Sequence, residues 1–264
     1  MCRWAAYSGD PVYLEDLILS PAHSLIEQSH HARQAKTPIN GDGFGVAWYG
    51  ERDEPGLYRD ILPAWADRNL ASLARQIRSG LFLAHVRAST IGETSRVNCH
   101  PFVWGNWSFM HNGQIGDFAT LRRPLELALD DSLYNARTGS TDSEILFLLA
   151  LQFGLGTDPQ AAFARTIRFV ENEARMRGLT PFVRFTSAFS CGRRLFAIRY
   201  SSDEHAPTLF WAKLETCRSI CLVSEPFEDA ARDWQPVPPS SFVTVEDGSL
   251  TVAPFCLERT ARAA

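Results

Sequence analysis

The sequence predicts an α+β protein in which β-sheets are stacked on each other and covered by helices. Strand-like segments occur in both halves of the 264-residue chain, and two helices are predicted between them. This arrangement favours packed sheets buried by helices, because each sheet must cover its apolar face. No segment is rich enough in Pro, Gly or Ser to require a domain boundary, and PVPPSS at 236–241 is the nearest candidate. We therefore expect residues 2–264 to form a single domain.

The first half of the chain contains three predicted strands and two short predicted helices. The strands are GFGVAWY (43–49), LFLAHVRAS (81–89) and WSFMHNGQI (107–115), and the helices occupy 13–19 and 66–78. We expect Asn112-Gly113 to break the third strand, because Asn-Gly is the commonest two-residue hairpin turn.

The second half begins with two longer predicted helices and then becomes rich in strands. The helix over 158–177 has Asp158 as its N-cap, Pro159 at its first position and Gly178 after its end, which are the residues preferred at these positions of a helix. The preceding helix is predicted over 142–153. The longest apolar stretch, ILFLLALQFGLG (145–156), is too short to span a bilayer and indicates a buried helix. The strands are predicted at 185–191, 194–200, 208–214, 219–224 and 242–255, the last with an Asp247-Gly248 hairpin signal.

Composition and charge exclude several classes of protein. The formal net charge is −4 and the pI is near 6.0, and the arginines are spread evenly, which argues against a nucleic-acid surface. Acidic residues interrupt the first twenty positions, which argues against a signal peptide and predicts a cytoplasmic protein with reduced thiols. Cys217 and Cys221 have a spacing found in some zinc sites, but no second ligand pair accompanies them, so we expect no metal site.

Several short motifs each have an ordinary interpretation. The HNG at 111–113 can be a hairpin turn, and Arg87 can be a surface arginine at the end of a strand. Asp142, Ser140 or Thr141 can cap the helix that follows. Cys2 has one chemical use: if Met1 is removed, a thiol and a free α-amine share one carbon, which pairs a nucleophile with its own base.

The order of these motifs is specific, although each alone is weak. The series is Cys2, GDGFG (41–45), AHVRAST (84–90), NCHPF (98–102), HNG (111–113) and TDSE (141–144). It resembles the glutaminase domain of class II glutamine amidotransferases, which are N-terminal-nucleophile hydrolases. The resemblance covers residues 2–150 and extends more loosely to LVSEPFED (222–229), as in the short stand-alone members that cleave γ-glutamyl compounds. It implies a four-layer αββα sandwich that residues 151–264 complete.

The resemblance also implies a role for each matching residue. Cys2 would attack the γ-amide of glutamine or of a γ-glutamyl compound, with its own α-amine as base, and water would hydrolyse the resulting thioester. The side chain of Asn112 and the backbone N–H of Gly113 would stabilise the oxyanion. The substrate-binding residues would be Arg87 and Thr90 at the α-carboxylate, Asp142 at the α-ammonium, and His100 and His111 as supports.

Two departures and one absence leave the wider function open. Family members fused to synthase domains commonly carry an aromatic residue at the position of Ala88 and histidine at the position of Ile91, so the sequence fits the stand-alone type better. No synthase domain is evident. The alternatives are a hydrolase of a small-molecule substrate, a glutaminase subunit that passes ammonia to a separate synthase, and a silent glutamine-binding module. The chemistry needs no cofactor, and we expect no membrane partner, while a homo-oligomer stays possible.

Overall fold

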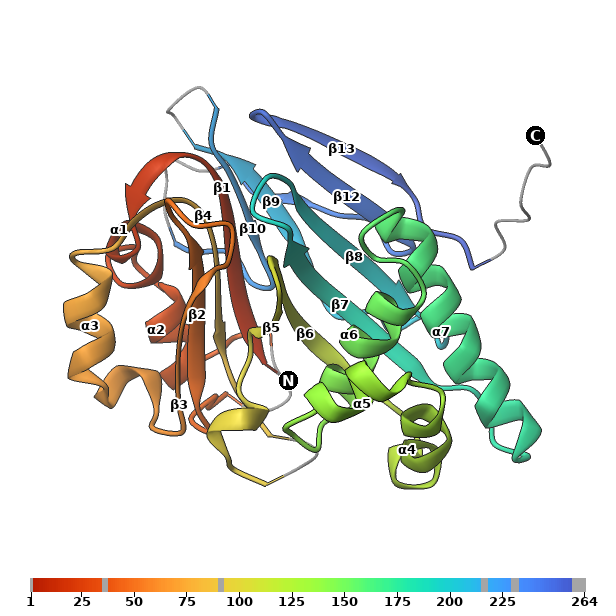
Figure 1. Ribbon diagram of the computed structural model, residues 1–264. Helices are drawn as coiled ribbons and strands as arrows, with labels where there is room; N and C mark the ends of the chain where they lie inside the picture. Colours follow the sequence, from red (N-terminus) through yellow and green to blue (C-terminus); the bar gives the residue numbers. More distant parts are fainter. Residues whose placement is uncertain (1, 35–37, 90–92, 215–217, 229–232, 258–264) are drawn as a thin grey trace.

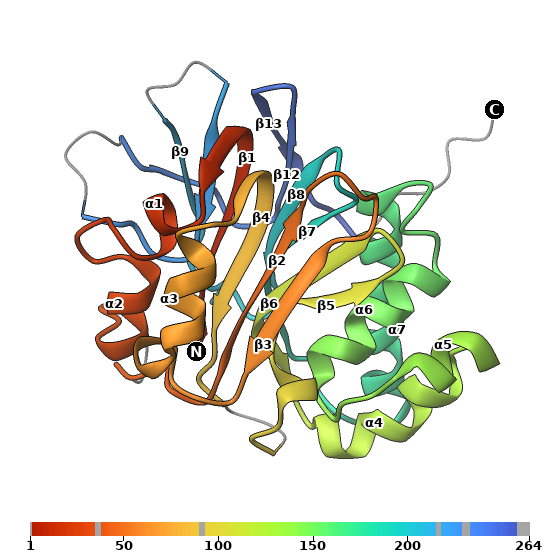
Figure 2. The ribbon, with the colours of Figure 1, turned by 60° about the vertical axis from the view of Figure 1, so that its left-hand side comes forward.

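The chain folds into two stacked antiparallel sheets with helices on both outer faces. The computed structural model describes residues 2–34, 38–89, 93–214, 218–228 and 233–257. Within these residues helices α1–α3 cover one sheet and helices α4–α7 cover the other (Figures 1 and 2). The layers therefore follow the order αββα, which confirms the predicted fold class.

The first sheet has seven strands in the order β11-β9-β10-β1-β4-β2-β3. Its strands are β1 (Arg3–Tyr13), β2 (Phe44–Tyr49), β3 (Gly56–Asp60), β4 (Arg78–Val86), β9 (Phe210–Lys213), β10 (Ile220–Val223) and β11 (Gln235–Pro236). The helices on its outer face are α1 (Glu15–Ile18), α2 (Leu25–His30) and α3 (Arg68–Ala74).

The second sheet has six strands in the order β13-β12-β8-β7-β6-β5. Its strands are β5 (Phe102–Trp104), β6 (Trp107–Ile115), β7 (Val183–Ser190), β8 (Leu195–Ser201), β12 (Ser241–Glu246) and β13 (Ser249–Pro254). The helices on its outer face are α4 (Phe118–Leu127), α5 (Asp131–Ala136), α6 (Asp142–Gln152) and α7 (Pro159–Met176).

Three apolar cores hold these layers together. Alternate residues of one strand point to opposite faces, so β6 contributes Phe109 to the core under α6 and α7 and Met110 to the core between the sheets. The core between the sheets also contains Trp4 and Leu83 of the first sheet. Because the central strands of each sheet are buried on both faces, their sequences are nearly continuous apolar runs rather than alternating apolar and polar residues.

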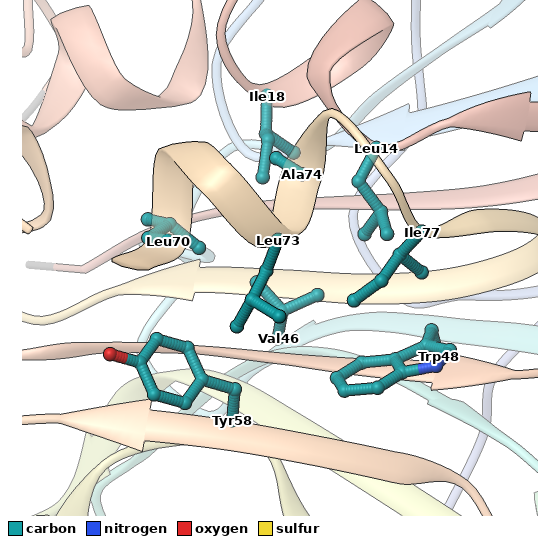
Figure 3. A pocket seen from close by; sticks show the side chains of 9 residues that line it. All are labelled: Leu14, Ile18, Val46, Trp48, Tyr58, Leu70, Leu73, Ala74 and Ile77. Atoms are coloured by element: carbon teal, nitrogen blue, oxygen red, sulfur yellow. The ribbon is translucent and has the colours of Figure 1, made fainter. Parts of the chain in front are cut away.

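The outer core of the first sheet includes a small apolar hollow beneath α3. Figure 3 shows Leu73 of α3 pointing toward Val46 of β2, with Trp48 and Ile77 beside them. Every residue that lines this hollow is aliphatic or aromatic. It therefore lacks the polar groups that catalysis needs, and we assign it to the packing of α3 on the sheet.

The N-terminal segment forms a central strand that the sequence analysis did not predict. Strand β1 begins at Arg3 and pairs with β4 on one side and β10 on the other. Gly9, Asp10 and Pro11 lie inside its span and resemble a turn signal in the sequence. The pairing shifts register between Ser8 and Val12, which accommodates these residues. Cys2 is therefore anchored next to a buried strand rather than on a frayed terminus.

The prediction that Asn112-Gly113 breaks its strand was wrong. Strand β6 continues through both residues, which pair with Thr186 and Phe185 of β7. Pairing along the whole of β6 overrides the local preference of Asn-Gly for a turn. The Asp247-Gly248 hairpin was predicted correctly, since both residues have positive φ and join β12 to β13.

The two long helices agree closely with their predicted bounds. The Asp158 side chain accepts a hydrogen bond from Ala161 N and caps α7, and Thr141 rather than Asp142 caps α6. Helices α1 and α3 are shorter than expected, and α2, α4 and α5 were not predicted, in part because α4 contains Pro124. In the described part of the chain, no helix combines the length and apolar character needed to cross a membrane.

Candidate active site

A small pocket surrounds Cys2 at one end of the sandwich, where the ends of several elements converge. It is lined by residues from the start of β1, the segment after β4, the segment before β5, strand β6 and the N-terminal end of α6: Cys2, Arg87, Ala88, Ser89, His100, His111, Gly113, Thr141, Asp142 and Ser143. The structure thus brings six of the eight predicted site residues to one pocket. Asn112 precedes one of them in β6, and Thr90 lies outside the described residues.

The Cys2 thiol is held by the backbone of Ala88. Its Sγ lies 3.5 Å from Ala88 N, which donates to it, and 3.6 Å from Ala88 O. Burial raises the pKa of the Cys2 thiol, although the Ala88 N–H and the charges of Arg87 and Arg3 act in the opposite direction. The thiol is therefore protonated near neutral pH, and a base must remove its proton before it can attack a carbonyl.

The Asn112 side chain offers unsatisfied hydrogen-bonding capacity next to Gly113, which lines the pocket with Cys2. Asn112 is only 1% exposed, and neither its Nδ2 nor its Oδ1 has a partner among the described residues. A buried amide without a partner costs stability, so its retention points to a ligand that completes it. Gly113 admits no side chain, because an added Cβ would lie 1.8 Å from Arg184 O and 2.5 Å from His111 Nε2.

Arg87 is fixed from behind by the GDG motif. Its backbone N donates to Gly43 O at 2.8 Å, and its backbone O accepts from Asp42 N at 3.0 Å. The Asp42 carboxylate also accepts from Ser89 N at 2.7 Å. Arg87 is 3% exposed and lines the pocket, so a guanidinium is presented there on a rigid backbone. The role of Asp42 was missed, although its motif was recognised.

Asp142 enters the pocket from the first turn of α6. Because the Thr141 side chain accepts from Glu144 N and caps the helix, the Asp142 carboxylate is not used as a cap. Its Oδ2 accepts from Ile115 N at 2.8 Å, which ties α6 to the end of β6. Asp142 thus places a carboxylate in the same pocket that Arg87 lines.

The three buried histidines near the pocket differ in their contacts. His111 Nε2 donates to Arg184 O at 3.2 Å, so its Nδ1 accepts from Ser143 Oγ at 2.9 Å, and the predicted supporting role fits this contact. His100 lines the pocket, yet neither ring nitrogen has a partner in the described chain. The rings of His85 and His100 contact each other in a tilted arrangement, with centroids 4.3 Å apart. Burial lowers the pKa of all three and that of His85 to about 3.

These histidines are expected to make the fold sensitive to acid. The unfolded chain binds protons near pH 6.5, whereas buried His85 stays neutral until about pH 3, so stability decreases as the pH falls through this range. Each such histidine contributes about 1.4 kcal/mol per pH unit. Denaturant unfolding at pH 7 and pH 5 measures the loss, and carboxylates titrate mostly below this window. His85→Gln is expected to make the dependence shallower without removing it, because His100 and His111 still contribute. His31→Gln, at an exposed histidine, is the control. Equal stability at both pH values would contradict the assignment.

The described residues contain no group of three or more His, Cys, Asp or Glu side chains arranged to hold a metal ion. Cys221 is buried in the outer core of the first sheet. Cys217, its partner in the sequence spacing, lies outside the described residues, as does Ile91.

The sequence is similar to a known protein family and to two named proteins. Residues 16–210 match the family described as class II glutamine amidotransferases. The chain is 33% identical to the probable glutamine amidotransferase DUG3 of Saccharomyces cerevisiae, over 97% of this chain and 84% of that protein. It is 32% identical to the gamma-glutamyl-hercynylcysteine sulfoxide hydrolase of Mycolicibacterium smegmatis, over 97% of this chain and all of that protein (100%).

Two solved structures have a similar fold. A glutamine aminotransferase class-II domain protein from Silicibacter pomeroyi superposes with a TM-score of 0.78 and 42% identity, covering 96% of this chain and 99% of that one. The allosteric regulatory enzyme of purine biosynthesis superposes with a TM-score of 0.69 over 97% of this chain but only 50% of its own length. At 14% identity this second likeness concerns the fold alone.

Proposed function

The chain belongs to the class II glutamine amidotransferases, and its similarity to these relatives supports an amidohydrolase activity. We propose that Cys2 is the nucleophile that cleaves γ-glutamyl amides. The Cys2 sulfur adds to the γ-carbonyl carbon while its proton passes to the Cys2 α-amine. The carbon–nitrogen bond then breaks, and the leaving amine takes that proton. Water hydrolyses the γ-glutamyl thioester, which releases glutamate and restores the thiol.

The observation that carries this proposal is the convergence of complementary groups on one pocket. Cys2, Gly113, Arg87 and Asp142 line it together, although they are far apart in the sequence. Because burial raises the pKa of the thiol, a nearby base is needed. An α-amine, with an ordinary pKa of about 7.7–8.0, suits this task near neutral pH once Met1 is removed.

The substrate class follows from the charges in the pocket. A free γ-glutamyl head group carries an α-carboxylate that suits the Arg87 guanidinium and an α-ammonium that suits Asp142. The oxyanion would receive hydrogen bonds from Asn112 Nδ2 and Gly113 N–H. We propose water as the acceptor, as in the relative named a hydrolase. We also propose that residues 2–264 act as one domain, because both sheets combine strands from the two halves of the chain.

A second candidate is a glutaminase subunit that delivers ammonia to a separate synthase. It is supported by the relative named a probable glutamine amidotransferase. The two candidates differ in what the purified chain does alone. Turnover of a γ-glutamyl substrate by the isolated protein favours the hydrolase, whereas turnover that appears only after a partner protein is added favours the subunit.

Labelling with an electrophilic glutamine analogue tests the proposal directly. Diazo-oxo-norleucine carries the γ-glutamyl head group and alkylates a nucleophile placed at the γ-carbon. Intact-mass analysis is expected to detect one adduct on a chain that lacks Met1, and peptide mapping is expected to locate it on Cys2. Retention of Met1, or an adduct on another cysteine, would contradict the proposed nucleophile.

Arg87→Lys tests the recognition of the substrate carboxylate. Lysine keeps the charge but loses the two parallel hydrogen bonds of a guanidinium, which is expected to raise KM by about 10- to 100-fold with a smaller change in kcat. Steady-state kinetics with glutamine measure both constants. Arg199→Lys is the control, since the Arg199 guanidinium donates to the carbonyls of Pro207 and Val237 and Arg199 does not line the pocket. An unchanged KM in Arg87→Lys would mean that the carboxylate binds elsewhere.

A further inference from the structure

Glu225 is a buried carboxylate outside the pocket whose hydrogen-bonding capacity is completely filled. It is 2% exposed and follows the end of β10. Its Oε1 accepts from His23 Nε2 at 2.6 Å and Arg33 N at 2.8 Å. Its Oε2 accepts from Gln34 N at 2.9 Å and Arg3 Nη1 at 3.4 Å. Each oxygen thus receives two donors, which is the full capacity of a carboxylate.

One side of this cluster holds the segment that carries the nucleophile. Arg3 directly follows Cys2, is fully buried, and forms an ion pair with Glu225. The neighbouring Ser224 reinforces this contact, because its Oγ accepts from Trp4 N at 2.9 Å and its backbone N donates to Trp4 O at 3.0 Å. Ser224 and Glu225 therefore fix the two residues after Cys2 by both backbone and side chain.

The other side of the cluster binds the segment that leads to the Gly41–Gly43 turn, whose backbone hydrogen-bonds to Arg87. Glu225 receives the backbone N–H groups of Arg33 and Gln34, and its own backbone O accepts from Gln28 Nε2 at 3.1 Å. Asn40 Nδ2 donates to Gln28 O at 3.3 Å, and Asn40 is followed by the Gly41–Gly43 turn that pairs with Arg87. A short chain of buried polar contacts thus joins Glu225 to the backbone behind Arg87.

His23, in this cluster, has an unfavourable backbone conformation. It has a left-handed backbone with φ of 54°, which is unusual for a residue other than glycine. Such a conformation persists where the surrounding contacts determine it. Here it directs Nε2 onto Glu225. Burial alone would raise the pKa of Glu225, but the Arg33 N–H, His23, the Gln34 N–H and Arg3 together lower it, so the carboxylate is charged.

We propose that Glu225 is a positioning residue that sets the distance between the nucleophile at Cys2 and the head-group site at Arg87. Its carboxylate binds the Arg3 side chain next to Cys2 and the backbone N–H groups of Arg33 and Gln34. Its backbone O binds Gln28, which leads through Asn40 to the turn behind Arg87. This inference rests on the proposed function, since it takes Cys2 and Arg87 as the groups to be aligned. An error of about 1 Å in such an alignment can reduce a rate by about 100-fold.

The test compares two reagents that modify Cys2. Diazo-oxo-norleucine needs the thiol and the head-group site in the correct geometry, whereas iodoacetamide needs the thiol alone. The ratio of their rate constants at Cys2, measured by peptide mass spectrometry, therefore reports alignment. Glu225→Gln replaces one acceptor oxygen by a donor that faces donors, and the ratio is expected to decrease by about 10- to 100-fold. A purely structural loss would not change the ratio.

Two further variants keep the test decisive. His23→Asn tolerates the left-handed backbone but is too short to reach Glu225, so a smaller decrease in the same direction is expected. Glu228→Gln removes only the exposed ion pair with Arg33 and should leave the ratio within about twofold of wild type. If Glu225→Gln does not fold, His23→Asn decides alone.

The outcomes separate the two levels of the argument. A wild-type chain that diazo-oxo-norleucine fails to label overturns the proposed function and this inference with it. A labelled wild-type chain whose ratio is unchanged in the folded variants overturns the positioning role alone. A decrease in the folded variants, together with an unchanged Glu228→Gln control, supports the positioning role.

Discussion

Cys2→Ala is expected to reduce the hydrolysis of γ-glutamyl amides by about a thousandfold or more while leaving the fold intact. Within the described residues, the hydrogen bonds of the Sγ atom are made with the backbone of Ala88, so its removal breaks no side-chain network there. The residual oxyanion donors and head-group contacts cannot replace the covalent step. Glutamate release from glutamine measures activity, and thermal unfolding checks the fold. Cys256→Ala, which removes an exposed thiol elsewhere, should behave as wild type.

A blocked terminus should cause the same loss without changing the thiol. An uncleaved extension before Cys2 converts the α-amine into an amide, which cannot accept a proton near neutral pH. If the extended protein keeps wild-type activity, the base is another group, and unpartnered His100 becomes the first residue to replace. If Cys2→Ala itself keeps wild-type turnover, the nucleophile has been assigned incorrectly.

The residues that line the candidate site could be predicted from the sequence better than their contacts. Cys2 and Arg87 stand out because their residue types suit one proposed task each and because of their order along the chain, and both line the pocket. The two long helices were also predictable, because Asp158, Pro159 and the apolar pattern are local signals. Such signals do not depend on which distant segment lies alongside them.

The features that escaped prediction are those decided by distant contacts. Strand β1 carries Gly9, Asp10 and Pro11, and only its pairing with β4 and β10 makes it a strand. Asn112-Gly113 has the composition of a turn, and the pairing of β6 with β7 extends it. Glu225 lies more than two hundred residues from Arg3, so no local pattern could indicate their ion pair. Residue types and local helix signals can thus be recognised in the sequence, whereas the relative placement of distant residues depends on tertiary structure.

Asn112→Leu is expected to decrease kcat/KM by about 100- to 1,000-fold while increasing the stability of the free protein. Loss of one oxyanion donor costs about 2.7–4 kcal/mol in the rate step. In the free protein, however, both polar atoms of the buried Asn112 amide have no partner in the described chain. Replacing such a group by an apolar side chain of similar shape removes a penalty of about 1–3 kcal/mol.

The opposite signs of these two effects make the measurement discriminating. Steady-state kinetics and denaturant unfolding are performed on the same preparation. Ser187→Ala is the matched control, because Ser187 Oγ is also buried without a partner in the described chain but Ser187 does not line the pocket. This variant is expected to keep wild-type activity. A structural asparagine would lose stability and activity together. Wild-type activity in Asn112→Leu would mean that another group stabilises the oxyanion, whereas an inactive but more stable variant would show that the fold keeps this amide unsatisfied for its substrate.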